Sequence, residues 1–282
     1  MSDQTHPGDI SRRALIMTTL TTGFALAVQP AADAAVIHTD SAGLVAGEIK
    51  FKAADGIMIP AYEAYPTGGG KHPVVLVVQE IFGVHEHIKD MCRRFAKRGY
   101  YAVAPELYAR QGDVSKLTDF KDILAIVGKV PDTQVMSDLD AVAAHAAATG
   151  HADAAKMAIT GFCWGGRVVW LYAAHNPKLK AGAAWYGRIK GGVAPGAKNP
   201  IDIAETFTVP VIGFYGGQDT GIPQEDVSAM TEALAKGRSG SQIIVYADAG
   251  HGFNADYRPS YNEKDAKSAF ATLLAWFKSH GV

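Results

Sequence analysis

The stretch that most constrains this chain runs from Gly161 to Gly166 and reads Gly-Phe-Cys-Trp-Gly-Gly. It follows an apolar run over 156–160 and precedes a helix-like run over 167–175. Glycines two places before and after Cys163 permit a turn too tight for larger side chains, which lifts the central residue out of a sheet. The pattern predicts a strand, a sharp turn with a thiol at its apex, and a helix. The alternative is a purely structural turn of small residues.

The remaining segments alternate between strand-like and helix-like patterns. Segments 47–53 and 57–65 alternate polar and apolar residues around an Asp-Gly turn, which predicts an antiparallel strand pair, with Pro60 favouring an edge position for the second strand. The apolar run 74–80 predicts a central strand covered on both faces. Further strands are expected at 100–105, 181–187, 209–216 and 242–246, and helices at 88–98, 135–149, 227–236 and 262–278. This order predicts an α/β fold with a mostly parallel central sheet and helices on both faces.

Length and charge narrow the class of protein. The 282 residues suffice for one large domain with a sizeable core. The 27 basic and 28 acidic residues nearly balance, and no basic block stands out, which disfavours nucleic acid or an anionic membrane surface as a partner.

The N-terminus has the pattern of a secretory signal. An arginine pair, Arg12 and Arg13, precedes a moderately apolar, threonine-containing stretch over 14–28, and an Ala-x-Ala site follows. We expect residues 1–35 to form a twin-arginine-type signal peptide with its cleavage region, so that the export machinery is a transient partner and the mature protein is periplasmic or exported. The alternative, a membrane anchor, is disfavoured because the apolar stretch is short and rich in threonine.

Downstream, residues 36–46 read as a linker, and residues 47–282 as a single α/β domain with no internal repeat. Within that domain, the polar segment 112–133 is expected to form short helices over the site.

Two further residues, each located after a later predicted strand, complete a catalytic pattern with Cys163. Asp219 and His251 follow it in the order nucleophile, acid, histidine. A free thiol has a pKa of about 8.5, so a neighbouring imidazole is needed to take its proton, and a carboxylate to orient that imidazole. Taken alone, Asp219 could cap a helix and His251 could be a solvated loop residue. Asp248 is a rival for the acid role, although its closeness to His251 in sequence favours a role in the loop.

The same chemistry requires an oxyanion hole built from two backbone N–H groups. One is expected from Trp164, the residue after the nucleophile, and the other from Ile81, which follows the strand at 74–80.

Five motifs together resemble the dienelactone hydrolase (carboxymethylenebutenolidase) family of the α/β-hydrolase superfamily. They are Gln79-Glu80-Ile81-Phe82-Gly83, Pro105-Glu106-Leu107-Tyr108-Ala109-Arg110, the Gly161–Gly166 stretch, Gly217-Gln218-Asp219, and Ala249-Gly250-His251-Gly252-Phe253. The resemblance runs from about residue 47 to the end of the chain. It implies an α/β-hydrolase fold and a Cys163-Asp219-His251 triad. It also implies that Glu80 lies beside the thiol and helps to take its proton when substrate binds.

The groups that would select a substrate depart from the family pattern. Family members that act on dienelactone hold its carboxylate with two arginines, but residues 112–133 contain no arginine and Ala255 stands at the second position. Arg258 is the candidate to replace them, since arginine suits carboxylate binding; the alternative is a surface pair with Asp256. Three further substrate-binding candidates are Tyr108, Arg110 and Trp185, of which the two aromatics could equally be core residues.

These observations predict a thiol-dependent hydrolase of small esters or lactones that works through an acyl-enzyme on Cys163 and needs no cofactor. The alternatives are an exported, non-catalytic small-molecule binding protein with the same fold, and a redox sensor at Cys163. The His85-Glu86-His87 sequence suggests a metal site, but alternate helix positions do not share a face and no further ligand cluster is evident. We expect Cys92 to be a buried hydrophobe and both thiols to be free.

Overall fold

The computed structural model describes residues 36–191 and 197–282. The expected signal peptide, residues 1–35, lies outside the described residues. No helix in the described part of the chain is long and apolar enough to cross a membrane.

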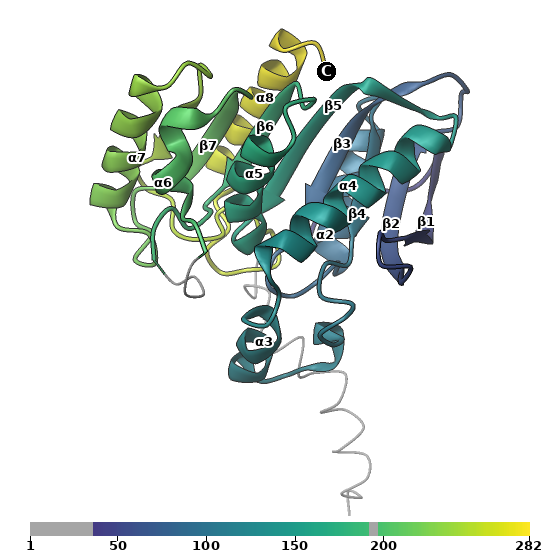
Figure 1. The fold of residues 1–282 in the computed structure, drawn as a ribbon, viewed down its shortest axis with the longest axis horizontal. Helices are drawn as coiled ribbons and strands as arrows, with labels where there is room; N and C mark the ends of the chain where they lie inside the picture. Colours follow the sequence, from purple (N-terminus) through teal and green to yellow (C-terminus); the bar gives the residue numbers. More distant parts are fainter. Residues whose placement is uncertain (1–35, 192–196) are drawn as a thin grey trace, which may run out of the picture.

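The core of the molecule is a mixed sheet of eight strands (Figure 1). The strands lie in the order β1-β2-β4-β3-β5-β6-β7-β8, and those from β4 to β8 across the sheet are parallel. Their bounds are β1 Leu44–Lys52, β2 Met58–Pro66, β3 His72–Val78, β4 Tyr101–Pro105, β5 Ala152–Phe162, β6 Ala181–Trp185, β7 Val211–Gly216 and β8 Gln242–Tyr246. The α/β architecture expected from the alternating pattern is therefore confirmed.

The antiparallel strand pair is present, but β2 is not an edge strand. It lies between β1 and β4 and pairs antiparallel with both. The Pro60 carbonyl accepts a hydrogen bond from Glu106 N–H, so the backbone groups of Pro60 face the side of β4. The ladder between β2 and β4 begins only at Ala61. Pro60 is tolerated because no ladder bond needs the N–H that proline lacks. The expectation of an edge position was wrong, since proline is excluded only where a ladder requires its donor.

Helices cover both faces of the sheet. In Figure 1, α4 and α5 lie in front of the strands and α2 and α8 behind them. The helix bounds are α2 Glu86–Ala96, α3 Phe120–Val127, α4 Asp132–Ala148, α5 Trp164–His175, α6 Pro200–Ile203, α7 Gln224–Lys236 and α8 Glu263–Ser279, with 3₁₀ turns at Val114–Lys116 and Ala204–Thr206. Because both faces are covered, residues Val74 to Val78 of β3 are wholly buried, as their continuous apolar sequence predicts.

The segment between β4 and α4 forms a small separate unit over the carboxyl ends of β3 and β4. Figure 1 shows α3 below the sheet. Val114 and Ile123 from this unit are buried against a second hydrophobic cluster, which contains Ile81, Phe82 and Tyr108. The segment therefore lies next to the loop that follows β3, as expected for an element over the site.

The segment before β1 is attached to α2. Thr39 N–H donates to Asp90 at 2.5 Å, Arg93 Nε donates to the Thr39 carbonyl at 2.7 Å, and Lys97 pairs with Asp40 at 2.6 Å. This part of the expected linker thus packs on the domain, because Asp90 and Arg93 of α2 bind the backbone N–H and carbonyl of Thr39.

Candidate active site

Cys163 lies at the apex of a strained turn between β5 and α5. Its backbone has φ 55° and ψ −113°, a conformation that residues with a Cβ rarely adopt. The backbone approaches closely on both sides: a Cβ on Gly161 would lie 2.4 Å from the Gly165 carbonyl oxygen, and one on Gly165 would lie 2.5 Å from the Gln79 carbonyl oxygen. The glycines on either side of the thiol are therefore required by contact, as their spacing predicts.

Adding a methyl group at this turn should destabilise the fold. We expect Gly165→Ala to lower the free energy of unfolding by about 2 kcal/mol or more, because a backbone carbonyl cannot rotate away as a side chain can. Gly47→Ala in β1 is the control, since a Cβ there meets nothing within 4 Å; its effect should stay within about 0.5 kcal/mol. Urea unfolding of both variants gives the comparison, and equal stabilities would contradict the close approach.

Cys163, His251 and Asp219 are joined by hydrogen bonds although they are far apart in sequence. His251 Nε2 lies 3.2 Å from Cys163 Sγ, and His251 Nδ1 lies 2.7 Å from Asp219 Oδ2. Asp219 follows β7 and His251 follows β8, so the carboxyl ends of parallel strands bring all three to one edge of the sheet. The rival Asp248 is exposed and forms no hydrogen bond or ion pair with His251 in the described chain.

The Asp219 carboxylate is placed to orient the imidazole. It is 5% exposed, and its second oxygen accepts the Gly221 N–H at 2.8 Å. Helix α7 begins only at Gln224 with Pro223 as its N-cap residue, so Asp219 does not cap that helix. An ionised carboxylate only accepts hydrogen bonds, so Nδ1 of His251 carries the proton and Nε2 faces the thiol.

The charge balance at His251 favours the imidazolium form. Burial, the largest effect, lowers its pKa, but the hydrogen bonds to Asp219 and Cys163 outweigh burial and raise the pKa to about 10. An imidazole with this bias can accept a proton from the thiol and hold it.

The backbone N–H groups of Ile81 and Trp164 occupy equivalent places after two neighbouring strands. Val78 of β3 pairs with Gly161 of β5, and Ile81 and Trp164 follow these paired residues by three positions each. Neither N–H donates to another backbone carbonyl in residues 36–191 and 197–282. Trp164 is also the first residue of α5, where helix N–H groups lack intrahelical partners. Both groups thus lack a backbone acceptor, which leaves them available to donate to another oxygen.

Glu80 is wholly buried and is held by several donors. Its Oε2 lies 3.2 Å from His85 Nε2 and accepts the Tyr257 hydroxyl, and its Oε1 lies 3.6 Å from Arg258 Nη2. Burial, the largest effect, raises its pKa, but Arg258 and His85 outweigh burial, so the pKa is lowered and the group is ionised. In the described chain, neither oxygen makes a hydrogen bond with Cys163 Sγ.

Arg258 faces Glu80 and does not pair with Asp256. Its guanidinium lies 5.0 Å from the Phe82 ring centre, next to the loop that carries Ile81. Asp256 is buried and binds His87 and Arg94 instead. The alternative of a surface pair was therefore wrong, because the chain turns at these residues and their side chains lie in different environments.

The other substrate-binding candidates lie away from the thiol or behind it. Arg110 forms a bidentate pair with Asp138 at 2.6 and 2.9 Å and a further pair with Asp55, so its donors are already used. Trp185 is wholly buried in the core, and only its carbonyl reaches the turn, where it accepts Cys163 N–H at 3.0 Å. Tyr108 is also buried, and its ring contacts Trp164 at 5.0 Å between centres. The geometry does not support direct substrate contacts from Arg110 or Trp185.

Two residues beside Glu80 were not assigned to the site from the sequence. They are His85 and Tyr257, which both bind the Glu80 carboxylate. Tyr186, an aromatic that the sequence left open as either pocket-lining or core, has a positive φ of 38° and its ring lies 5.2 Å from that of His251. Tyr257 lies 177 residues from Glu80 and His85 lies 5 residues from it. Sequence periodicity does not predict either contact.

The two thiols differ in environment, and neither forms a disulfide. Cys92 is wholly buried in α2, and burial raises its pKa, as expected of a small hydrophobe. Cys163 is partly exposed at its turn. The expectation of two free thiols is therefore confirmed.

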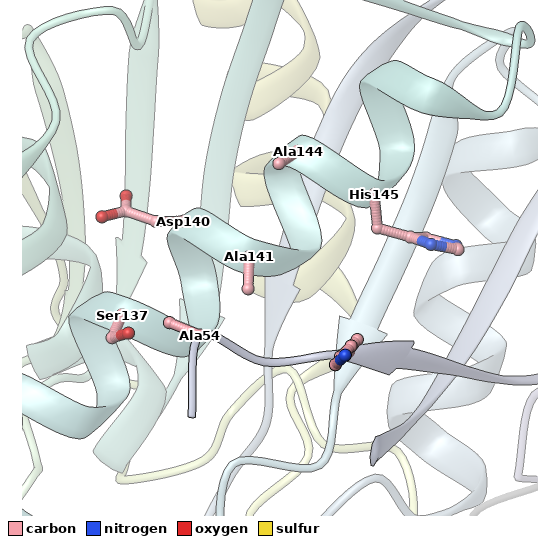
Figure 2. A pocket seen from close by; sticks show the side chains of 7 residues that line it. Ala54, Ser137, Asp140, Ala141, Ala144 and His145 are labelled. Atoms are coloured by element: carbon pink, nitrogen blue, oxygen red, sulfur yellow. The ribbon is translucent and has the colours of Figure 1, made fainter. Parts of the chain in front are cut away.

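A groove elsewhere on the molecule does not belong to this site. Figure 2 shows it between the β1–β2 turn and α4. Its volume is about 580 Å³. Its lining residues are Lys52, Ala54, Ser137, Asp140, Ala141, Ala144 and His145. None belongs to the loops that carry Cys163, Asp219 or His251. No cluster of three or more potential metal ligands occurs in the described part of the chain, where His85 and His87 bind carboxylates instead.

Known proteins resemble this chain over almost its whole length. Two relatives named "Putative carboxymethylenebutenolidase" are similar: one from Methylorubrum extorquens is 58% identical, covering 97% of this chain and 94% of its own, and one from Escherichia coli K12 is 51% identical, covering 94% and 97%. A crystal structure from Klebsiella pneumoniae, described as a "Putative Dienelactone Hydrolase", has a TM-score of 0.81 and 51% identity, covering 83% of this chain and 98% of its own. The sequence model of the dienelactone hydrolase family matches residues 59–281. With the five motifs at one edge of an α/β-hydrolase sheet, these matches show that the chain belongs to the dienelactone hydrolase family.

Proposed function

We propose that this protein hydrolyses small esters or lactones through an acyl-enzyme on Cys163. The observation that supports this most directly is the hydrogen-bonded series from Cys163 through His251 to Asp219. A thiol on a strained turn, a base within reach of it and a buried carboxylate behind the base are the parts that nucleophilic acyl transfer needs. Family membership independently supports a hydrolase.

In the first half-reaction, His251 Nε2 takes the thiol proton and Cys163 Sγ attacks the carbonyl carbon. As the carbon–sulfur bond forms, the carbonyl π electrons move to oxygen, where the N–H groups of Ile81 and Trp164 stabilise the developing charge. The intermediate collapses when the bond to the leaving oxygen breaks. His251 gives its proton to that oxygen, which leaves a thioester on Cys163.

In the second half-reaction, water replaces the alcohol. His251 takes a proton from the water, whose oxygen attacks the thioester carbon, and the same two N–H groups hold the oxyanion. The carbonyl then re-forms, the carbon–sulfur bond breaks and the acid leaves. His251 returns the proton to the sulfur, which restores the thiol and the neutral imidazole. No cofactor enters either half-reaction.

For the substrate, we propose that Arg258 contacts an acyl group that bears a carboxylate. Its Nη1 and Nη2 make no hydrogen bond among the described residues, although Nη2 lies 3.6 Å from Glu80. A panel of aryl esters with neutral and carboxylate-bearing acyl groups tests this. Arg258→Ala should reduce kcat/KM for the charged substrates by about tenfold or more while the neutral ones change by less than about threefold.

The control for that panel is Arg188→Ala, which removes an exposed arginine three residues beyond β6. It should leave both substrate classes unchanged. A wild-type enzyme with no preference for charged acyl groups, or an equal loss for both classes in Arg258→Ala, would count against carboxylate recognition by Arg258.

The alternative function is a binding protein that has lost turnover. A burst of one product equivalent without further turnover would support it, whereas sustained hydrolysis would exclude it. For a redox sensor at Cys163, peroxide should oxidise the thiol while esters are left intact.

We also propose that residues 1–35 direct export by the twin-arginine route. The paired arginines and the apolar stretch that follows them support this. Replacing Arg12 and Arg13 by lysine should leave the unprocessed precursor in the cytoplasm, as judged by fractionation and mass. Equal export of the double variant would contradict the route.

A further inference from the structure

The segment that follows β4 contacts both ends of the loop that follows β3. The Tyr108 hydroxyl donates to the Glu80 carbonyl at 3.3 Å, and Glu106 Oε2 accepts the Val84 N–H at 2.8 Å. Tyr108 is wholly buried, so its hydroxyl cannot exchange this acceptor for bulk water. Ile81 lies between the two contacts, and its backbone N–H is one of the two groups that the proposed mechanism uses to hold the oxyanion.

The Tyr108 contact bears directly on the direction of the Ile81 N–H. The Glu80 carbonyl and the Ile81 N–H belong to one peptide group, which is planar and trans, so its oxygen and its hydrogen point in opposite directions. A donor that holds the oxygen therefore also fixes the direction of the N–H. The Gly83 N–H donates to the same carbonyl at 3.4 Å, so this oxygen is held by two donors.

Tyr108 also contacts the residue that carries the second N–H of the proposed oxyanion hole. Its ring centre lies 5.0 Å from that of Trp164, with the two planes at 65°. Trp164 packs on the same hydrophobic cluster that contains Ile81, Phe82 and Tyr108. One buried side chain thus touches both of the segments that supply a donor.

The Glu106 contact is reinforced by close packing. Gly83 has a positive φ of 76°, and a Cβ there would lie 2.9 Å from Glu106 Oε2 and 3.0 Å from Val114 Cγ2. The backbone of the loop therefore lies directly against the carboxylate that accepts the Val84 N–H. The loop is held at this end by shape as well as by the hydrogen bond.

From these contacts we infer that Tyr108 is a positioning residue for the oxyanion hole, which acts through the peptide group between Glu80 and Ile81. Its ring supports Trp164 at the same time, and Glu106 anchors the far end of the loop. The inference rests on the proposed acyl transfer at Cys163. Tyr108 then affects the chemical step through the backbone, and not by binding the substrate.

The first test removes only the hydroxyl of Tyr108. Deleting an oxyanion donor outright costs about 10²- to 10³-fold in kcat. Tyr108→Phe leaves the Ile81 N–H in place but releases its peptide group, so we expect kcat for an aryl ester to fall by about tenfold. Because the interaction is made with the transition state and not with the bound substrate, KM should stay within about twofold.

The matched control is Tyr172→Phe. Tyr172 is also a wholly buried tyrosine, but its hydroxyl donates to Asp140 of α4 at 2.9 Å. Its removal should leave kcat and KM within about twofold of wild type.

Alkylation separates the positioning role from general damage to the site. Iodoacetamide reacts when the Cys163 thiolate displaces iodide from a saturated carbon, so the attacked carbon carries no oxyanion. We expect the alkylation rate of Tyr108→Phe to stay within about twofold of wild type although its kcat falls. A packing defect would instead slow both reactions.

The second test addresses Glu106 with two variants. Glu106→Leu removes the acceptor of the Val84 N–H, whereas Glu106→Gln keeps an amide oxygen that can accept it. We expect Glu106→Leu to lower kcat by about tenfold while KM and the alkylation rate are retained, and Glu106→Gln to keep kcat within about threefold of wild type.

Four results would overturn the inference. They are a wild-type kcat in Tyr108→Phe, a loss of alkylation rate equal to the loss of kcat, a raised KM with kcat retained, and equal kcat values in Glu106→Leu and Glu106→Gln. The third would indicate that Tyr108 binds substrate directly. Failure of the proposed function is distinguishable from all four, because it would appear as hydrolysis that persists after Cys163 is fully alkylated.

Discussion

Cys163→Ala should lower kcat/KM for aryl ester hydrolysis by about 10⁴-fold or more, because no other group can form the acyl-enzyme. The remaining rate would come from the oxyanion hole and from binding alone. Cys163→Ser should also lose most of the activity, since an alcohol is far harder to ionise than a thiol in a site built for a thiolate. Steady-state kinetics with freshly reduced protein gives the comparison.

The control for these variants is Cys92→Ala. Cys92 is wholly buried in α2 and contacts none of the site residues through a hydrogen bond in the described chain. Its loss should leave kcat/KM within about twofold while slightly lowering stability. If Cys163→Ala retained the wild-type rate, a thiol mechanism would be excluded whatever the fold.

Asp219→Asn should have the second largest effect, a loss of about 10³- to 10⁴-fold in kcat. An asparagine amide can donate to Nδ1 of His251, which favours the tautomer with its proton on Nε2, where it cannot accept from the thiol. The imidazolium also loses its counter-ion. The hydrogen bond to Asp219 raises the pKa of His251, so this pKa should fall in Asp219→Asn. NMR titration of the His251 ring measures the change.

Asp248→Asn is the matched control, because Asp248 lies in the same loop as His251 but is exposed and forms no hydrogen bond or ion pair with it in the described chain. We expect its kcat to stay within about twofold of wild type. A large loss in Asp248→Asn together with a small one in Asp219→Asn would reverse the assignment of the acid.

The local patterns of the sequence predicted most of the fold. The expected strand at 242–246 matches β8, and the expected helix at 227–236 lies within α7, which begins three residues earlier. Buried parallel strands have continuous apolar sequences. Gly99, three residues after the end of α2, has a positive φ of 92° and donates its N–H to the Ala96 carbonyl. Both features are encoded locally. The order of Cys163, Asp219 and His251 placed them at strand ends that the sheet brings together.

The polar contacts between distant segments were not predictable in this way. Arg258 and Asp256 are two residues apart in sequence, yet one faces Glu80 and the other binds His87 and Arg94. Arg110 is two residues from a site aromatic, yet Asp138 of α4 binds it. Which buried charge meets which partner depends on packing in three dimensions, so periodicity and spacing do not determine it.

The position of Pro60 shows the same limit for the backbone. A proline in a strand shows that one N–H donor is missing from the ladder. It does not show which neighbouring strand that donor would have faced, or whether it lies at the end of a ladder. Only the register with β4, which begins at Ala61, explains why an inner strand tolerates it.

The most direct measurement of the central claim is the mass of the acyl-enzyme. The mature protein is mixed with a slow aryl ester, quenched in acid during turnover, and analysed by intact mass and peptide mapping. We expect a mass increase of one acyl group on the peptide that contains Cys163, sensitive to hydroxylamine and absent in Cys163→Ala. Full turnover with no acyl adduct, or with the adduct on another residue, would contradict nucleophilic catalysis by Cys163.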